Sequence, residues 1–353
     1  MNRRRSPGDS TSWDGGTGKT KQWRARGRGW GSLTTIGGLR VNELELLERI
    51  REWLPAGGGA RLIRGAGDDC AILRPAGAAE DWLATTDLFL EGVHFEADSC
   101  PAFDAGRRAL CRGLSDIAAM GGRPRFCLIS LSLGAGAGPG WVKRFYAGLL
   151  ELARRTGTAV IGGDLAKGPE TGCDVVVLGT VPKGGAMRRD RARPGQAIYV
   201  SGELGGSALG LQTRRGAAWK RHLRPEPRLE LGRYLRRLGV KAAMDLSDGL
   251  STDLHRLAKE SGVAAVVDRP LPVFHGAGLE QALHGGEDYE LLFTAPPRLK
   301  IPSRHRGVPL TRIGTIVRGE PGAVEFFGSP LEAGGWDHFA GERRRGSLRS
   351  RGG

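Results

Sequence analysis

The chain of 353 residues has little of what membrane and secreted proteins require. Its longest apolar stretch, residues 126–142, is interrupted by four glycines and a proline, so we expect no transmembrane span. Three consecutive arginines, Arg3 to Arg5, stand near the start, but the apolar segment of a secretory signal does not follow them. We therefore expect a cytoplasmic protein without a membrane partner.

The signals of zinc, disulfide and P-loop proteins are also weak. The five cysteines form no C-x-x-C pair, which favours reduced structural thiols. The seven histidines show neither H-x-x-x-H nor H-E-x-x-H spacing. The stretch "WDGGTGKT", 13–20, ends like a phosphate-binding loop, but Trp13 stands where the pattern needs glycine and no apolar strand precedes it. We expect no zinc site and no P-loop.

Acidic residues are outnumbered, and the net charge is +15. Residues 1–40 hold nine basic and two acidic side chains, and residues 342–353 hold five basic and one acidic. The remaining residues, 41–341, hold 39 basic and 35 acidic side chains and are nearly balanced. Both ends are rich in Gly and Arg and lack periodic apolar residues, so we expect disordered basic tails. Weak nucleic-acid contact through the tails stays open as an alternative. A natural start at Val41, just before the first convincing helix, also stays open.

Periodicity of the apolar residues predicts a mixed α/β body. Expected helices cover 43–54, 105–121, 141–157, 203–215, 226–238 and 253–262, and expected strands cover 81–95, 125–133, 158–164, 173–181, 196–202 and 287–296, with another before "AAMDLSDG". A basic connector, 183–195, divides the body into two α/β domains, 41–183 and 184–341.

Acidic residues gather in six turns that are flanked by glycine or that follow a strand. They are "GAGDDCAIL", "ATTDLFLEGVH", "LSDIAAMGG", "VIGGDLAKGP", "MDLSDG" and "HGGEDYEL". Any one of these carboxylates could be a turn former or a helix cap. Six together exceed what caps require, and few basic residues stand beside them. Hard oxygen ligands of this kind favour Mg²⁺, which completes its shell with phosphates.

The same motifs, in this order, resemble the thiamine-monophosphate kinase family. The likeness extends over eight stretches: "GDDCAIL", "TTDLFLEGVHF", "LSDIAAMGGRPRFCLISLSL", "IGGDLAKGP", "YVSGELGGSALGL", "RHLRPEPRLELG", "MDLSDGLSTDL" and "GGEDYELLFT". It covers about residues 41–341. That family belongs to the superfamily of aminoimidazole ribonucleotide synthetase and selenophosphate synthetase.

The resemblance implies ATP-dependent phosphorylation of thiamine monophosphate to thiamine diphosphate, by direct in-line transfer assisted by several Mg²⁺ ions. It implies an α/β (α+β) fold with two domains. The N-terminal domain, 41–183, would bind ATP and Mg²⁺ and form the dimer, and the C-terminal α/β domain would cover 184–341. The N-terminal domains are expected to form a shared barrel in a homodimer. No covalent nucleophile is implied, since the acceptor phosphate attacks directly.

The resemblance assigns roles to individual residues. The expected magnesium positions are Asp69, Thr86, Asp87, Asp116, Asp164, Asp245 and Asp248, with Asp87 and Asp116 central to catalysis. The expected ATP contacts are Tyr146, Gly163, Asp164, Arg189 and Ser247. The expected thiamine monophosphate contacts are His94, Glu287 and Trp336, whose ring can stack on the cationic thiazolium.

Two residues depart from the pattern of this family, and other members of the superfamily have to be considered. Leu165 and Lys167 stand where the family more often has Thr and Arg, which puts part of the nucleotide contacts in doubt. A selenophosphate synthetase would show a reactive cysteine in an N-terminal glycine-rich segment, and no cysteine precedes Cys70. Another ATP-using member of the superfamily, or an RNA-associated protein acting through its tails, remains the alternative.

Overall fold

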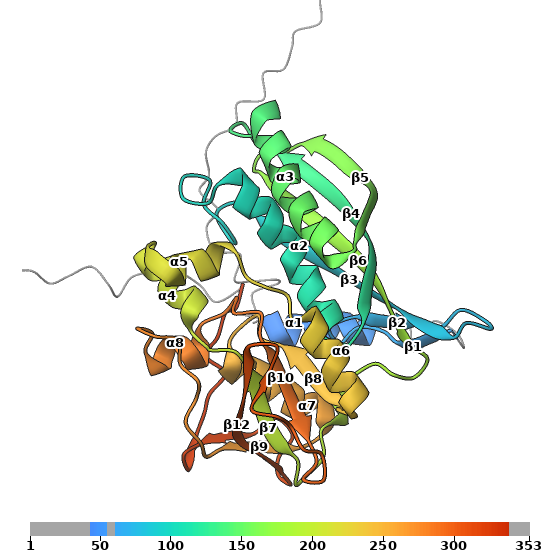
Figure 1. Ribbon diagram of the computed structural model, residues 1–353, viewed down its shortest axis with the longest axis vertical. Helices are drawn as coiled ribbons and strands as arrows, with labels where there is room; N and C mark the ends of the chain where they lie inside the picture. The colour runs from blue at the N-terminus through green and yellow to red at the C-terminus, as the bar shows by residue number, and fades with distance from the viewer. Residues whose placement is uncertain (1–42, 55–60, 339–353) are drawn as a thin grey trace, which may run out of the picture. The chain divides into compact units, whose positions relative to one another are not determined.

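The computed structural model describes residues 43–54 and 61–338, which form two β-sheets with helices packed against them (Figure 1). The basic tails expected at 1–40 and 342–353 lie outside the described residues. Within the described part of the chain, no helix is long and apolar enough to cross a bilayer. The buried apolar side chains form two clusters: one joins the first sheet to a face of the second, through Ala243, Leu291 and Phe293, and the other packs on the second sheet's opposite face.

The first sheet is antiparallel except for the β4–β5 pair. In spatial order its strands are β1 (Leu62–Arg64), β2 (Ala71–Leu73), β3 (Glu80–Leu90), β6 (Gly172–Pro182), β4 (Arg123–Leu133) and β5 (Ala159–Lys167).

The second sheet is also mainly antiparallel, with one parallel pair, β13–β9. Its order is β14 (Ser329–Pro330), β13 (Val324–Phe326), β9 (Ala264–Val267), β12 (Val308–Val317), β7 (Ala197–Ser201), β10 (Leu291–Ala295) and β8 (Ala242–Asp245), with β11 (Arg304–His305) paired to β12.

The helices join and cover these sheets. They are α1 (Glu43–Trp53), α2 (Ala102–Ala119), α3 (Pro139–Thr156), the 3₁₀ turn η1 (Arg189–Arg191), α4 (Gly206–Thr213), α5 (Gly216–Leu223), α6 (Leu229–Leu238), α7 (Leu250–Ser261) and α8 (Leu279–His284).

Helix α3 shows how local sequence sets an element's ends. Pro139 occupies the first helical turn, where its missing N–H costs nothing, and Gly157 closes the helix in the left-handed region with φ 71°. Its buried residues, which include Phe145, Leu149 and Leu152, recur at helical spacing and face the first sheet's core.

Helix α2 is the central element, because it contacts strands β3 and β6 of the first sheet, strand β8 of the second, and helices α3 and α6 (Figure 1). Glycines allow these close approaches. A Cβ added to Gly148 would lie 1.8 Å from the carbonyl oxygen of Phe103, and one added to Gly232 would lie 2.0 Å from that of Ala118. Side chains that α2 carries are therefore held between both sheets.

Most of the expected elements are present, with differences at their ends. The strand expected over 81–95 ends at Leu90, since a turn over 91–95 follows it. Helix α7 begins at Leu250, three residues before the expected position. The helix expected over 203–215 is followed by a second one, α5, that apolar spacing does not predict. Within the sheets, strands β9 and β12 were also not expected.

We predict that Gly148→Ala will destabilise the protein by about 1–3 kcal/mol, because the added methyl group must push α2 and α3 apart. The matched control is Gly140→Ala in the same helix, where a Cβ would meet no atom within 4 Å. That variant should be neutral or more stable by about 0.5–1 kcal/mol. Urea unfolding measures both, and equal stabilities for the two variants would contradict the close helix contact.

Candidate functional site

Carboxylates from both sheets and from α2 meet in one place. Oxygen atoms of Asp69, Asp116 and Asp245 all lie within 4.8 Å of one another. Asp69 precedes β2, Asp116 lies on the last turns of α2, and Asp245 ends β8. Asp87 on β3 lies beside them, since its Oδ2 is 3.6 Å from where a Cβ of Gly113 on α2 would be, and its charge raises the pKa of Asp116. We call these four residues the carboxylate cluster.

The environment of the cluster disfavours negative charge. Burial, followed by the charge of Asp69, raises the pKa of Asp245 to about 7. Burial and then the charges of Asp87 and Asp245 raise the pKa of Asp116 well above its ordinary value. Like charges this close repel one another in a low dielectric. The cluster is therefore short of positive charge.

Arg189 supplies one cation to the cluster. Its Nη2 donates to Asp69 Oδ1 at 2.5 Å, and its backbone N–H donates to Asp68 Oδ1 at 3.2 Å. Even so, burial and the charge of Asp69 raise the pKa of Asp68 to about 7. With Arg112, whose Nη2 lies 3.5 Å from Asp87 Oδ1, two guanidinium groups face the four carboxylates of the cluster and do not balance them. Arg189, which we predicted as an ATP contact, thus lies at the cluster itself.

The residues present fit a divalent cation. Asp69 Oδ2 and Asp87 Oδ2 are buried and make no hydrogen bond in the structure. A buried carboxylate oxygen without a partner costs free energy, which a bound cation would offset. The donor set is all oxygen, as Mg²⁺ prefers. Asp69, Asp87, Asp116 and Asp245 are the residues that could hold such ions.

Helix α2 and strand β3 face each other residue by residue next to the cluster. Positions 108, 112 and 116 of α2 recur every four residues, and positions 89, 87 and 85 of β3 alternate onto the same side. The three contacts that join them are Thr85 Oγ1 donating to Asp116, Arg112 Nη2 at 3.5 Å from Asp87 Oδ1, and the Arg108 guanidinium 5.4 Å from the centre of the Phe89 ring.

The three residues expected at thiamine monophosphate are gathered near the other end of this row. Glu287 accepts two hydrogen bonds from Arg108 Nη2, at 2.7 and 2.8 Å. The His94 and His338 ring centres are 5.4 Å apart, and those of His338 and Trp336 are 5.6 Å apart. Trp336 remains 44% exposed, so its indole can still receive a ligand. We call His94, Trp336 and His338 the aromatic group.

Charge around this group is fixed. Burial opposes ionisation of Glu287, but Arg108, His222 and Arg112 outweigh it and lower its pKa to about 2. Burial and the charge of Arg112 lower the pKa of His94 to about 3, so the ring is neutral near pH 7. Its Nδ1 accepts the Leu90 N–H at 3.0 Å, which leaves the proton on Nε2. His94 can therefore donate one hydrogen bond.

Two expected magnesium ligands lie elsewhere. Thr86 points to the opposite side of β3 from Asp87, where its Oγ1 donates to Asp174 Oδ1 at 2.6 Å. Asp164 pairs with Ser130, which pairs with Asp174, so it belongs to the same side of the sheet, and it is exposed. We call this side, opposite α2 and α3, the open face. Within one chain these side chains do not join the carboxylate cluster.

Asp248 lies at the edge of the cluster, in the loop after β8. Its side chain pairs with Arg256, and its charge contributes to the raised pKa of Asp87. Asp253 has a structural role instead, because its Oδ2 accepts the N–H groups of Asp248 and Gly249, both at 3.1 Å. Ser247 is held through its carbonyl, which accepts the Glu287 N–H at 2.7 Å. This loop thus ties the cluster to Glu287.

The remaining expected ATP contacts are spread over the first sheet. Gly163 lies on β5, where a Cβ would come within 1.8 Å of the Ile129 carbonyl oxygen, so only glycine fits. Tyr146 lies on α3, and its ring packs edge-on against Phe145, with ring centres 5.8 Å apart. Neither residue contacts the carboxylate cluster within the described chain. An ATP site that uses both would have to extend from the cluster along the sheet.

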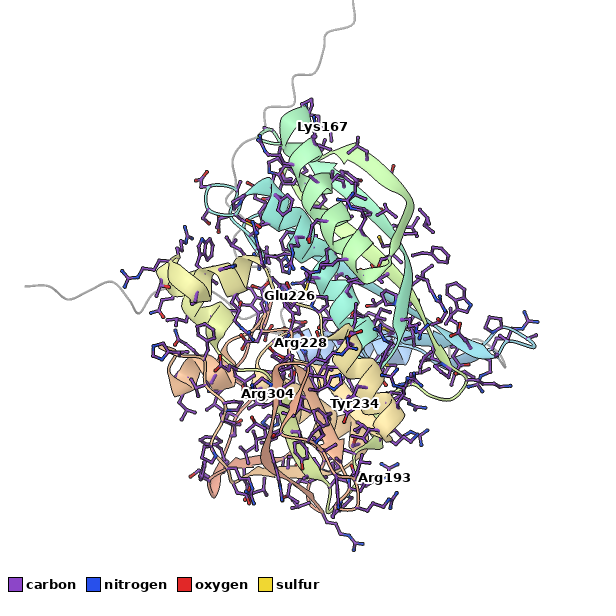
Figure 2. All side chains as sticks on the ribbon, viewed as in Figure 1. Lys167, Arg193, Glu226, Arg228, Tyr234 and Arg304 are labelled. Atoms are coloured by element: carbon purple, nitrogen blue, oxygen red, sulfur yellow. The ribbon has the colours of Figure 1, made fainter. Side chains whose placement is uncertain are left out.

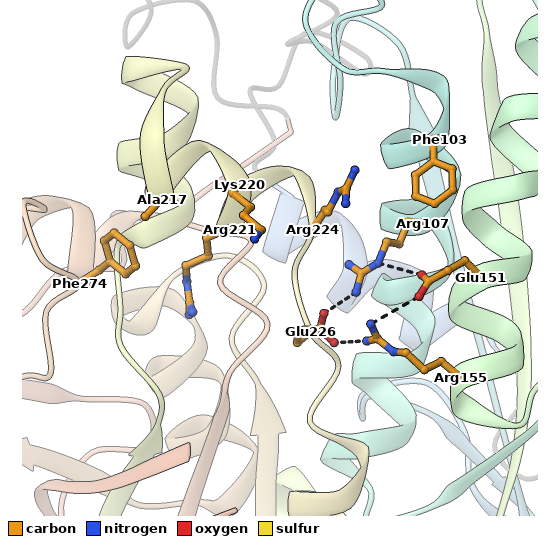
Figure 3. Close-up of a pocket in the computed structure, with 10 residues that line it drawn as sticks. All are labelled: Phe103, Arg107, Glu151, Arg155, Ala217, Lys220, Arg221, Arg224, Glu226 and Phe274. Atoms are coloured by element: carbon orange, nitrogen blue, oxygen red, sulfur yellow. Dashed lines mark hydrogen bonds and ion pairs between the residues drawn. The ribbon is translucent and has the colours of Figure 1, made fainter. Parts of the chain in front are cut away.

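A pocket of about 580 Å³ opens between α2, α3 and α5 (Figure 3). Arg107 donates to Glu226 at 2.5 Å and to Glu151 at 3.3 Å, and Arg155 pairs with the same two glutamates. Figure 2 shows Glu226 on the segment before Arg228, whose Nε donates to Glu290 at 2.7 Å. The pocket contains no residue of the cluster, and its wall is an ion-pair network that fastens this segment to α2 and α3.

Sequence reasoning missed Arg108, Arg112 and Asp174. A signal for the two arginines was present, since positions 108, 112 and 116 fall on one stripe of the predicted helix 105–121. Asp174 could not be found in this way, because its partner Thr86 is set by strand pairing between segments 88 residues apart.

Comparisons with known proteins identify the family of the chain. The family model of the AIR synthase related protein N-terminal domain matches residues 67–181, and that of the C-terminal domain matches residues 193–326. The thiamine-monophosphate kinase of Escherichia coli K12 is 39% identical over 303 residues, which is 78% of this chain and 92% of the relative. That of Aquifex aeolicus is 34% identical over 77% of this chain and 92% of its own.

Solved structures give the same result. A structure described as AaThiL complexed with AMPPCP and TMP superposes with a TM-score of 0.75 at 32% sequence identity. The match covers 86% of this chain and all of the other.

We predict that, in EDTA, Asp245→Asn will melt at a higher temperature than the wild type, by a margin that grows from pH 5 to about pH 7. The folded pKa of about 7 lies above the ordinary value near 4, so folding takes up a proton between the two. The wild type therefore loses stability as the pH rises through this window, and the neutral amide removes the part of that loss that comes from position 245. Calorimetry measures the margin. Added Mg²⁺ should raise the melting temperature of the wild type more than that of Asp245→Asn. A margin that does not change with pH would contradict the crowding of these carboxylates.

Proposed function

The chain belongs to the thiamine-monophosphate kinase family, and we propose that the carboxylate cluster and the aromatic group together are where it performs that family's reaction. It is an ATP-dependent kinase that phosphorylates thiamine monophosphate to thiamine diphosphate. The observation that carries the location is the row of side chains along α2, which connects a carboxylate cluster short of cations to an aromatic site with fixed charge.

The carboxylate cluster is the phosphate end of this site. Mg²⁺ ions held by Asp69, Asp87, Asp116 and Asp245 would neutralise the phosphates of ATP and of the acceptor, which otherwise repel each other. Thr85 orients Asp116 by donating a hydrogen bond, and Arg189 orients Asp69. These residues lie on strand, helix and turn positions that both sheets fix. Transfer therefore depends on positioning and electrostatics rather than on a nucleophile of the protein.

The aromatic group is the thiamine end. The Trp336 indole can stack on the cationic thiazolium, and the Glu287 carboxylate stays ionised beside it. His94 offers a hydrogen bond from Nε2 to a ring nitrogen or an oxygen of the substrate. Arg108 keeps Glu287 in place from the buried side. Thiamine monophosphate would then lie with its phosphate toward Arg112 and the carboxylate cluster.

We place the nucleotide along the first sheet, with Arg189 at its phosphates and Gly163, Asp164 and Tyr146 further out. Asp164 and Thr86 lie on or beside the open face, apart from the cluster in a single chain. That face and edge strand β5 expose apolar side chains, of which Leu88 is 57% and Leu165 62% exposed. A second copy that covers them in a homodimer, with the two first sheets forming a shared barrel, would bury this surface and enclose the nucleotide.

We predict that the purified protein converts thiamine monophosphate to thiamine diphosphate with ATP and Mg²⁺, and that Asp116→Asn lowers kcat about a hundredfold or more. The amide keeps the size of the side chain and removes the charge that holds the cation. The control is Asp268→Asn, at an exposed position after β9. Chromatographic assay of thiamine diphosphate gives the rates, and urea unfolding verifies the fold. Absence of product from the wild type, or full activity of Asp116→Asn, would refute the proposal.

A further inference from the structure

Arg112 lies between the two ends of the proposed site. It is on α2, one turn before Asp116 and one turn after Arg108. Its Nη2 lies 3.5 Å from Asp87 of the carboxylate cluster, and its Nη1 lies 3.6 Å from Glu287 Oε1. Its guanidinium thus reaches a cluster residue on one side and a residue of the thiamine end on the other.

Arg112 makes no close ion pair with its neighbours. Both carboxylate contacts are at or beyond the outer limit of a hydrogen bond, and its one short bond, 3.0 Å, goes to the neutral Tyr289 hydroxyl. Its Nε is buried and makes no hydrogen bond. A charge in a low-dielectric site with long contacts can still attract an anion strongly.

Arg108, four residues earlier, is held differently. It contacts both oxygens of Glu287 at 2.7 and 2.8 Å and lies over the Phe89 ring. Its side chain is only 2% exposed, whereas that of Arg112 is 16% exposed. Arg108 therefore fixes Glu287, and Arg112 is the arginine of the pair that a ligand can reach.

We infer that Arg112 binds the phosphate of thiamine monophosphate and so makes the site select the phosphorylated form over free thiamine. This rests on the proposed function and adds the residue that recognises the acceptor group. A phosphate at this place would lie between the aromatic group and the carboxylate cluster, as in-line transfer requires. The planar guanidinium offers two parallel N–H donors to phosphate oxygens, which a lysine cannot match.

The experiment compares two ligands that differ only in the phosphate. Calorimetry with Mg²⁺ and without ATP measures the binding of thiamine monophosphate and of thiamine to the wild type, Arg112→Gln and Arg112→Lys. The control is Arg125→Gln, at an ion pair with Glu80 near the start of β4. Urea unfolding verifies that each variant is folded.

We expect Arg112→Gln to bind thiamine monophosphate at least about tenfold more weakly and thiamine within about twofold of the wild type. Arg112→Lys should fall between, and Arg125→Gln should match the wild type. Equal weakening for both ligands would mean that Arg112 only orients Glu287, and no weakening for either would remove it from the site; both overturn the inference and leave the proposed function standing. A wild type that makes no thiamine diphosphate overturns the proposed function itself, and the inference with it.

Discussion

Repulsion among buried carboxylates is the constraint on which the rest of the site depends. Asp69, Asp116 and Asp245 come from three segments that are far apart in the sequence. The fold brings a carboxylate oxygen of each to within 4.8 Å of the other two. Such crowding weakens the folded state unless cations enter, so it is kept for a reason other than stability. Arg189 reduces it only in part, and buried oxygens remain without partners. This arrangement is the reason why we propose that the reaction requires cations.

Helix α2 turns that constraint into a site with two ends. It packs between the sheets because Gly148 and Gly232 let neighbouring helices approach its backbone. Most residues of α2 are buried. Arg108, Arg112 and Asp116 therefore all face residues that other elements hold fixed. The proposed acceptor end and the proposed cation end are thereby kept at a constant separation along one rigid helix. In-line transfer needs such a fixed separation more than it needs any one reactive side chain.

Local sequence predicted the parts of the fold that local rules govern. Helix α3 was expected over 141–157 and covers Pro139–Thr156, because a proline and a glycine define its ends. Strand β12 and helix α5 were not expected, since their formation depends on packing in the second domain rather than on a periodic pattern. The acidic turns pointed to the cluster, but they did not separate Thr86 from Asp87, which are neighbours on the expected strand. The alternation of side chains along β3 already required those two to face opposite sides. Arg112 lies on the same stripe of the predicted helix as Asp116, so helical spacing alone would place its guanidinium beside the acidic turns.

The most direct test of the account is to locate the cations. Crystals grown with Mn²⁺ in place of Mg²⁺ and an ATP analogue, with anomalous diffraction at the manganese edge, would place them without reference to activity. The account predicts at least one peak with oxygens of Asp69, Asp116 and Asp245 about 2.0–2.3 Å away, as hard divalent cations require. Full nucleotide occupancy with no peak among these three carboxylates would contradict it.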